Sequence, residues 1–416
     1  MNRNKLAIAM ALLLSVLLLG GCVSALLEPK ETVDSSSPSA SVSVDTSTIV
    51  VAEVNGVAIY KDKYDEMYSS LAYQYYMNGQ DTSSDAAVAA IRQETLDELI
   101  NDEVRTQKMG ELGFLTLTEQ DLDRAESDME DYLVSYIEAN CMSDVLATLE
   151  EGYTEEELEA AKVAYIDTLL EDNGIDRAEF QAVFEDGVMN KKAVEAAQGE
   201  VVPSEAEIKA KYDEYVASDK EAMKADATTY VTNVNSGVQL YYTPEGVRRV
   251  RQIAILMDTE TISAISLLRD NGYDVSADAL KEQGLAAIQA KAEEALGKIT
   301  SGSLSFEEAI AEYNEDTGMP TEGYPVMTGT TAYMTEFTDA AMALSTIGSY
   351  SELVATDYGY HIIEYYSDVP SGSVSYDLVK GDIADELEDT MMDEAWSALL
   401  EQWKTESDIV THEENL

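Results

Sequence analysis

Apolar residues recur at intervals of three and four along residues 62–218, a pattern that predicts a series of amphipathic helices. Capping boxes, in which a hydroxyl side chain and a glutamate three positions later bond each other's backbone amides, begin at Thr154 and Ser204. No repeat of fixed length is visible, which disfavours a solenoid. The three clearest helical patterns cover residues 87–109, 122–137 and 158–170.

Two β-favouring runs precede these helices, within residues 48–60. Asn55-Gly56 lies between the two runs and predicts a hairpin, because a type I′ turn needs positive φ at both central residues. Residues 225–246 are rich in Thr, Asn and Gly and are expected to mark a boundary after the helices.

A mixed pattern of strands and helices occupies residues 250–366, and a last amphipathic helix is expected at 375–406. Within the mixed region, a capping box starts one helix at Ser305. Thr335 is the expected cap of another helix, and Gly348 its stop. The predicted elements are strands at 250–256 and 360–366 and helices at 305–313 and 335–344.

Composition excludes several classes of function. Among 416 residues, 81 are acidic and 26 are basic, which gives a net charge of −55 and disfavours binding to nucleic acid or anionic lipid. This charge either steers cationic or neutral clients or simply keeps the surface soluble. With only two cysteines and two histidines, no zinc spacing, EF-hand or catalytic triad is indicated. The sequence therefore predicts no metal and no other cofactor.

Tyrosine is abundant, with 25 Tyr against 5 Phe. A dense cluster between residues 60 and 77 suits adaptable contacts with varied polypeptides, and we interpret it as a cradle for client proteins. Packing in a Phe-poor core is the alternative interpretation. The cluster consists of Tyr60, Tyr64, Tyr68, Tyr73, Tyr75, Tyr76 and Met77.

The chain starts with the pattern of a secretory signal: two positive charges, an apolar run over residues 6–19, and small residues before Cys22. The run is shorter than the roughly 20 residues that cross a bilayer core. Its Leu-Gly-Gly-Cys ending resembles a bacterial lipobox, which implies removal of residues 1–21 and lipidation of Cys22. An ordinary cleaved signal is the alternative. Residues 22–48 are then expected to form a disordered tether.

Four stretches within the mixed region resemble, in their order and approximate spacing, the motifs of a parvulin-type peptidyl-prolyl isomerase domain. The resemblance implies a small antiparallel sheet with helices, and rotation about Xaa-Pro bonds. Because twisting an amide loses resonance worth about 18–20 kcal/mol, such a site needs an apolar cup for proline beside a polar wall. The four stretches are Ser305-Phe-Glu-Glu-Ala309, Tyr313-Asn-Glu-Asp316, Met334 to Leu344 and Val354 to Ile363.

Residue roles follow from position in the resembled motifs. Tyr333, Met334 and Phe337 correspond to the cup that binds the proline ring. Asp316 corresponds to the acidic or thiol side chain that faces the reacting carbonyl. Without the resemblance, the aromatic residues would be interpreted as core packing and the acid as a solvated loop residue.

His361 and Thr356 correspond to the family's second histidine and its hydroxyl partner, whereas Gln252 replaces the first histidine. An amide both donates and accepts hydrogen bonds, so Gln252 can hold His361 in one tautomer as a neutral imidazole would. We therefore include Gln252, Thr356, His361 and Asp316 in the predicted catalytic set. The usual glycine-rich loop is also reduced, to Thr321–Pro325.

The hairpin followed by a long helix resembles the start of PrsA- and SurA-like foldases. The resemblance implies a mainly α chaperone module with an inserted α+β parvulin-like domain, and a C-terminal helix that packs on the chaperone module. The parvulin-like domain departs from the family by an insertion around residues 257–285, where 267–278 suggests a helix and a loop. The expected domains are 49–245 (chaperone), 246–368 (parvulin-like) and 369–416 (C-terminal helix).

The resulting prediction is a foldase held by lipid on the outer face of a bacterial cell membrane. Its expected partners are unfolded or partly folded secreted polypeptides with Xaa-Pro bonds. Two alternatives stay open: a holdase whose isomerase site is degenerate because of Gln252, and a solute-binding lipoprotein. The second predicts two similar α/β lobes, which the sequence does not indicate.

Overall fold

The computed structural model describes residues 46–149 and 153–416. The predicted signal peptide, Cys22 and the tether up to residue 45 lie outside the described residues. The last part of that tether, Thr46–Thr48, forms the 3-10 helix η1, where no regular structure was expected. Among the described residues, no helix combines the length and apolarity needed to cross a membrane.

The chain is mostly helical with small antiparallel sheets, and it divides into two compact units. The first unit comprises the described residues up to Val202 together with Leu387–Leu416, and the second is Pro203–Glu386. The second unit therefore extends beyond the predicted parvulin-like range at both ends.

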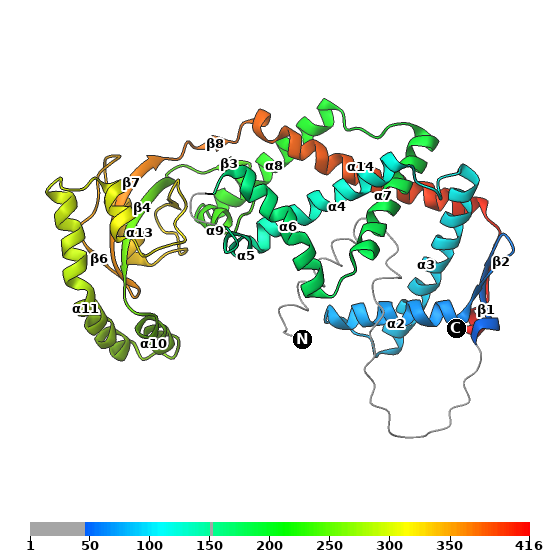
Figure 1. Ribbon diagram of the computed structural model, residues 1–416, viewed down its shortest axis with the longest axis horizontal. Helices are drawn as coiled ribbons and strands as arrows, with labels where there is room; N and C mark the ends of the chain where they lie inside the picture. Colours follow the sequence, from blue (N-terminus) through cyan, green and yellow to red (C-terminus); the bar gives the residue numbers. More distant parts are fainter. Residues whose placement is uncertain (1–45, 150–152) are drawn as a thin grey trace, which may run out of the picture. The chain divides into compact units, whose positions relative to one another are not determined.

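The first unit begins with the expected hairpin. Strands β1 (Val50–Val54) and β2 (Val57–Tyr60) flank Asn55 and Gly56, which have φ values of 50° and 80° and confirm the turn. The C-terminal strand β9 (Ile409–Thr411) pairs antiparallel with the other edge of β1, so the blue and red ends of the described chain lie side by side (Figure 1).

Four helices of the first unit begin at side-chain caps, and the other two begin without one. Thr154 and Glu157 form the predicted box at the start of α6 (Glu155–Asn173), and Gly113, with φ of 77°, ends α3 (Asp85–Leu112). A further box, Thr118 with Asp121, was missed because aspartate replaces the usual glutamate. The helices are α2 (Lys61–Met77), α3 (Asp85–Leu112), α4 (Glu119–Asn140), α5 (Met142–Leu146), α6 (Glu155–Asn173) and α7 (Arg177–Gln198).

The part of the C-terminal helix α14 (Tyr376–Glu406) that begins at Leu387 completes the main core of the first unit. Trp396 and Trp403 pack edge to face, with ring centroids 5.7 Å apart, against the core formed by β1 and α3. Helices α4 to α7 enclose a second core, in which Phe180 is fully buried.

The second unit is built around the four-stranded antiparallel sheet β5-β4-β7-β6. Helices α11 and α12 pack on one face through Ile253, Ile255 and Ile362, and α13 packs on the other through Phe337. The sheet strands are β4 (Arg248–Leu256), β5 (Tyr324–Val326), β6 (Val354–Ala355) and β7 (Gly359–Asp368). The helices are α10 (Thr259–Asp270), α11 (Asp274–Thr300), α12 (Phe306–Tyr313) and α13 (Thr335–Ala343).

The segment before this sheet is also structured. Helix α8 (Glu205–Ala225) starts at the predicted Ser204 capping box. The expected boundary at 225–246 contains the helix α9 (Thr229–Asn235) and the strand β3 (Tyr242–Thr243), which pairs with β8 (Gly372–Ser373). Tyr230 and Val231 of α9 are buried, which explains how a Thr- and Asn-rich stretch becomes ordered.

Three local predictions in the second unit were wrong. The insertion is not a helix and a loop through residue 278, because α10 and α11 are joined by the short turn at Asn271–Tyr273. Helix α13 is preceded by Met334, which makes no side-chain cap, so Thr335 is already inside the helix. That helix ends at Ala343, and Gly348 lies in a later turn.

Candidate functional site

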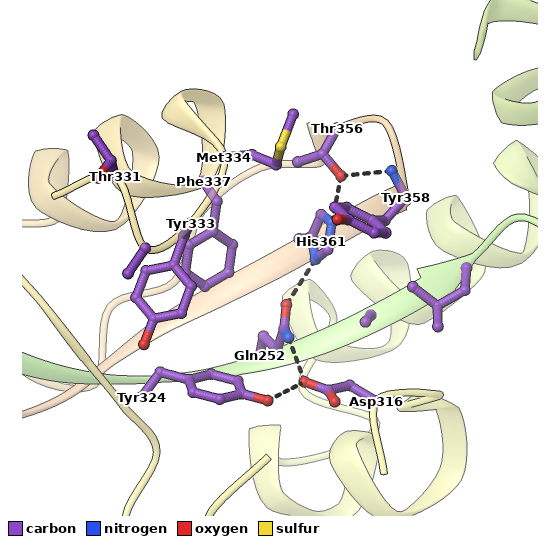
Figure 2. A pocket seen from close by; sticks show the side chains of 13 residues that line it. Gln252, Asp316, Tyr324, Thr331, Tyr333, Met334, Phe337, Thr356, Tyr358 and His361 are labelled. Atoms are coloured by element: carbon purple, nitrogen blue, oxygen red, sulfur yellow. Dashed lines mark hydrogen bonds between the residues drawn. The ribbon is translucent and has the colours of Figure 1, made fainter. Parts of the chain in front are cut away.

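A cavity of about 570 Å³ lies against the face of the β4–β7 sheet that α13 covers (Figure 2). The register pairs Ala254 with His361 and Gln252 with Ile363, so Gln252 and His361 reach the same face from neighbouring strands. A tight turn, in which the Thr356 amide donates to the Gly359 carbonyl at 2.9 Å, brings Thr356 beside them.

A continuous chain of hydrogen bonds forms one side of the cavity (Figure 2). Thr356 Oγ1 lies 2.8 Å from His361 Nε2, and His361 Nδ1 lies 2.7 Å from Gln252 Oε1. The other end of the same amide, Gln252 Nε2, donates to Asp316 Oδ2 at 2.6 Å. One glutamine side chain thus joins a histidine to a carboxylate.

The acceptors at both ends fix the direction of this chain. Because the amide N–H of Gln252 faces the Asp316 carboxylate, the Gln252 oxygen faces His361 and accepts from Nδ1–H. His361 Nε2 then accepts from the Thr356 hydroxyl, whose oxygen accepts from the Tyr358 amide at 3.1 Å. Burial lowers the pKa of His361 to about 4, and the charge of Asp316 opposes this shift only in part. The imidazole is therefore neutral at neutral pH.

The loop after α12 places Asp316 beside β4. Asn314 Oδ1 accepts from the Ala254 amide at 2.9 Å, and the Glu315 amide donates to the Ala254 carbonyl, so the loop pairs with the strand. Asp316 Oδ2 also accepts from the Tyr324 hydroxyl at 2.8 Å. Burial, together with this bond, raises the pKa of Tyr324 well above its usual value.

Aromatic rings form the opposite wall. The centroid distance is 5.6 Å between Tyr324 and Tyr333, and 5.5 Å between Tyr333 and Phe337. Phe337 meets the His361 ring edge to face, with centroids 5.7 Å apart, and Met334 lies beside them (Figure 2). An apolar pocket thus adjoins the chain of hydrogen bonds, which contains the neutral His361 imidazole and ends at the Asp316 carboxylate.

Comparison with known families matches two parts of the chain. Residues 275–367 match the family described as PPIC-type PPIase domain, and residues 6–131 match the SurA-like N-terminal domain. In these two parts the chain is similar to PrsA/SurA-like proteins with a parvulin-type domain.

Similar proteins carry the corresponding names. A foldase protein PrsA of Clostridium botulinum strain Langeland is 34% identical over 114 residues, which cover 27% of this chain and 34% of that protein. The PrsA of strain Loch Maree is 39% identical over 80 residues. The chain thus matches only about a third of the length of the curated relatives.

Solved structures are similar over more of the chain. The crystal structure of Bacillus subtilis PrsA is 16% identical and covers 86% of this chain and 93% of that chain, with a TM-score of 0.22. A SurA-like chaperone structure from Campylobacter jejuni is 11% identical and covers 88% and 99%, with a TM-score of 0.29.

All seven side chains predicted for the parvulin site line the single cavity of Figure 2, and their functional roles stay predictions. Sequence reasoning missed Tyr324 and Tyr358. Tyr324 lies in the reduced loop that was interpreted only as a rim, and its hydroxyl reaches Asp316. Tyr358 lies within a quoted parvulin motif, but no residue pattern indicated that its backbone amide would bond Thr356.

The tyrosine cluster of the SurA-like part contains a core-packed pair and an exposed group, while Tyr75 and Met77 are half-buried. Tyr64 is only 2% exposed, belongs to the core and stacks on Tyr68, so these two residues support the core-packing interpretation. Tyr60, Tyr73 and Tyr76 are exposed, at 41%, 51% and 67%. The predicted cradle therefore loses Tyr64 and keeps at most its exposed members.

Proposed function

We propose that this protein is an extracytoplasmic foldase that isomerises Xaa-Pro bonds in secreted polypeptides and holds these clients during folding. The supporting observation is the arrangement around one cavity, where the chain from Thr356 to Asp316 faces the aromatic wall centred on Phe337. The PPIC-type match covers most of these residues. Slow Xaa-Pro steps, of tens of seconds, are what such a catalyst would shorten.

The apolar wall would bind the proline ring. Phe337 is 5% exposed and forms a rigid base, while Tyr333 and Met334 are half-buried and line the sides. When the proline ring is held there, the carbonyl of the preceding client residue is free to rotate beside the hydrogen-bond chain from Thr356 to Asp316. Binding energy from the ring would thereby orient the amide whose rotation is catalysed.

The polar chain would favour the twisted amide over the planar one. Resonance places negative charge on the carbonyl oxygen of a planar amide, and twisting withdraws part of it. The Asp316 carboxylate, held by Gln252 and Tyr324, would therefore repel the planar form more than the twisted one. Neutral His361 keeps Gln252 in place and need not transfer a proton.

Isomerisation of an Ala-Ala-Pro-Phe peptide, followed by NMR exchange spectroscopy with the full-length protein, tests the proposal. The wild type is expected to accelerate the exchange, and Asp316→Ala and His361→Ala to lose most of this activity. Asp339→Asn, an exposed acid on α13, serves as the matched control and should keep the activity.

Two results would contradict the catalytic proposal. Wild-type protein with no activity would favour a holdase with a degenerate site. Full activity in Asp316→Ala would place catalysis outside this cavity.

Client holding would use exposed tyrosines of the first unit. Tyr73→Ser with Tyr76→Ser is expected to weaken suppression of aggregation of an unfolded client, because both rings are exposed and available for contact. Isomerase activity should be unchanged. Tyr64→Ser is unsuitable for this test, since Tyr64 is buried and its loss would damage the core.

Membrane attachment is proposed through lipid on Cys22. Metabolic labelling with a fatty acid should mark the wild type and leave Cys22→Ala unlabelled. Because two or more acyl chains are needed for stable anchoring, the variant should also leave the membrane fraction. A labelled Cys22→Ala protein would overturn this part of the proposal.

A further inference from the structure

A second cavity, of about 530 Å³, adjoins the first in the second unit. Met334 and Tyr358 line both cavities, so the two cavities are adjacent. The remaining wall comes from Ile262, Ser266 and Arg269 of α10, together with residues of α13 and of the turn after β6.

The second cavity depends on the insertion. Helix α10 ends at Asp270, whereas the match to the PPIC-type family begins at residue 275. Three of its lining residues therefore lie outside the part of the chain that this family match covers.

The cation in the cavity wall is already neutralised. Arg269 contacts Asp357 at 2.9 Å and Asp278 at 2.7 Å, and Asp357 also pairs with Lys281 at 3.0 Å. These ion pairs leave little capacity in Arg269 for an anionic ligand.

The carboxylates around the cavity exceed the cations. Glu336 lines the cavity with its side chain 47% exposed, and its ion pair with Lys281 is longer, at 3.6 Å. The cluster contains two cations and four carboxylates, a net charge of 2 − 4 = −2, with Asp274 as the fourth acid. The cavity therefore favours a positive group over a negative one.

The apolar part of the wall suits a long aliphatic stem. Ile262, Met334 and the ring of Tyr358 can cover methylene groups, while Glu336 can accept hydrogen bonds from the end of the side chain. Lysine and arginine combine such a stem with a cationic end.

We propose that this second cavity is a subsite for a lysine or arginine residue adjacent to the proline of a client. This inference rests on the proposed isomerase function and adds a preference among Xaa-Pro sequences to it. Ile262 and Glu336 are the residues that determine the preference, the first through the stem and the second through the charge.

The test compares two peptide series with the full-length protein, Ala-Xaa-Pro-Phe and Ala-Ala-Pro-Xaa, where Xaa is lysine, norleucine, alanine or glutamate. Norleucine matches the stem of lysine without its charge. In one series, lysine is expected to exceed norleucine about threefold in kcat/KM, as a partly exposed ion pair allows. Glutamate should fall below alanine.

Variants separate the two contributions. Glu336→Gln should remove the advantage of lysine over norleucine and leave the rate with alanine unchanged. Asp339→Asn, on the same helix but outside the cavity lining, should keep the advantage. Ile262→Ser should reduce the advantage of both lysine and norleucine over alanine.

The outcomes distinguish the two proposals. If the alanine peptide is isomerised but lysine has no advantage in either series, the subsite is wrong and the isomerase function stands. If no peptide is isomerised, the isomerase function is wrong, and peptide affinities measured by NMR titration decide the subsite. Equal affinities for lysine and norleucine peptides would then overturn it.

Discussion

Gln252 bonds His361 and Asp316 through the two ends of one amide group, with both bonds at 2.7 Å or less. A neutral imidazole also offers one donor and one acceptor, so glutamine preserves the pattern of bonds while removing a titratable group. The resemblance to parvulins located these side chains. Predicting the tautomer of His361 requires the three-dimensional positions of Gln252, Asp316 and Thr356, which no single stretch of sequence specifies.

Replacing Gln252 by leucine should lower kcat/KM for proline peptides roughly 10-fold or more, because it leaves the buried His361 donor unpaired, at a cost of about 1–3 kcal/mol, and removes one of the donors that hold Asp316. Gln252→His, which can supply one donor and one acceptor, should retain activity within a few-fold. NMR exchange spectroscopy measures both rates. Wild-type activity in Gln252→Leu would show that the chain of bonds is dispensable.

The proton of His361 should reside on Nδ1, and the ring should titrate with a pKa of about 4. Since this value lies below the usual 6.5 or so, the unfolded state binds the proton first. His361 should therefore reduce the free energy of unfolding as pH falls from about 6.5 towards 4, and contribute no pH dependence above that window.

Nitrogen-15 NMR of the imidazole reports both the tautomer and the titration, and His412 is the only other histidine in the sequence. A His361→Gln variant assigns the signals and should lack the corresponding pH dependence of stability. A ring that titrates near 6.5 would contradict the buried, neutral state.

At the scale of elements, local motifs were predictable where one short stretch contains both partners. The capping boxes at Thr154, Ser204 and Ser305 and the Asn55-Gly56 turn are of this kind. The α10–α11 hairpin was predicted only in part, because these helices are stabilised by packing against each other rather than by a local motif. Ile265 and Leu285, twenty positions apart, share one buried cluster.

Gly359 fixes the alignment of β4 and β7 at the site. Its φ is 155°, and an added Cβ would lie 2.1 Å from the Ile255 carbonyl oxygen, so no side chain fits without moving the backbone. Gly359→Ala should cost roughly 2–3 kcal/mol and shift the turn that carries Thr356. Urea unfolding followed by the His361 NMR signal measures the loss.

Gly348→Ala provides the comparison, since it also has positive φ but no atom lies within 4 Å of the added Cβ. It should show only the smaller cost of the backbone conformation. Equal losses in both variants would indicate that contact with Ile255 is unimportant.

At the scale of the whole molecule, the two compact units have separate cores, and both tryptophans belong to the first. Periodicity predicted the C-terminal helix that contains them. Because the two tryptophans are far from β1 in the sequence, only the family resemblance indicated that this helix packs on the first unit. The charge of −55 likewise describes the whole chain and identifies no site.

Trp403→Ala should destabilise the first unit by about 3–5 kcal/mol, as expected for truncating a buried aromatic side chain. Fluorescence of the remaining Trp396 follows unfolding of this unit, and the His361 NMR signal follows the second. The first transition should move to lower urea, and the second should stay in place. Equal shifts of both would show that the units unfold as one.

The antiparallel pairing of β1 with β9 also sets an order of assembly. A polypeptide that emerges from a ribosome or a translocation channel does so N-terminus first. The β1–β2 hairpin cannot pair with its third strand until residues 409–411 have been synthesised, whereas the whole of Pro203–Glu386 has been synthesised earlier. The first unit, whose synthesis begins first, would therefore complete its fold last, after the second unit has already folded.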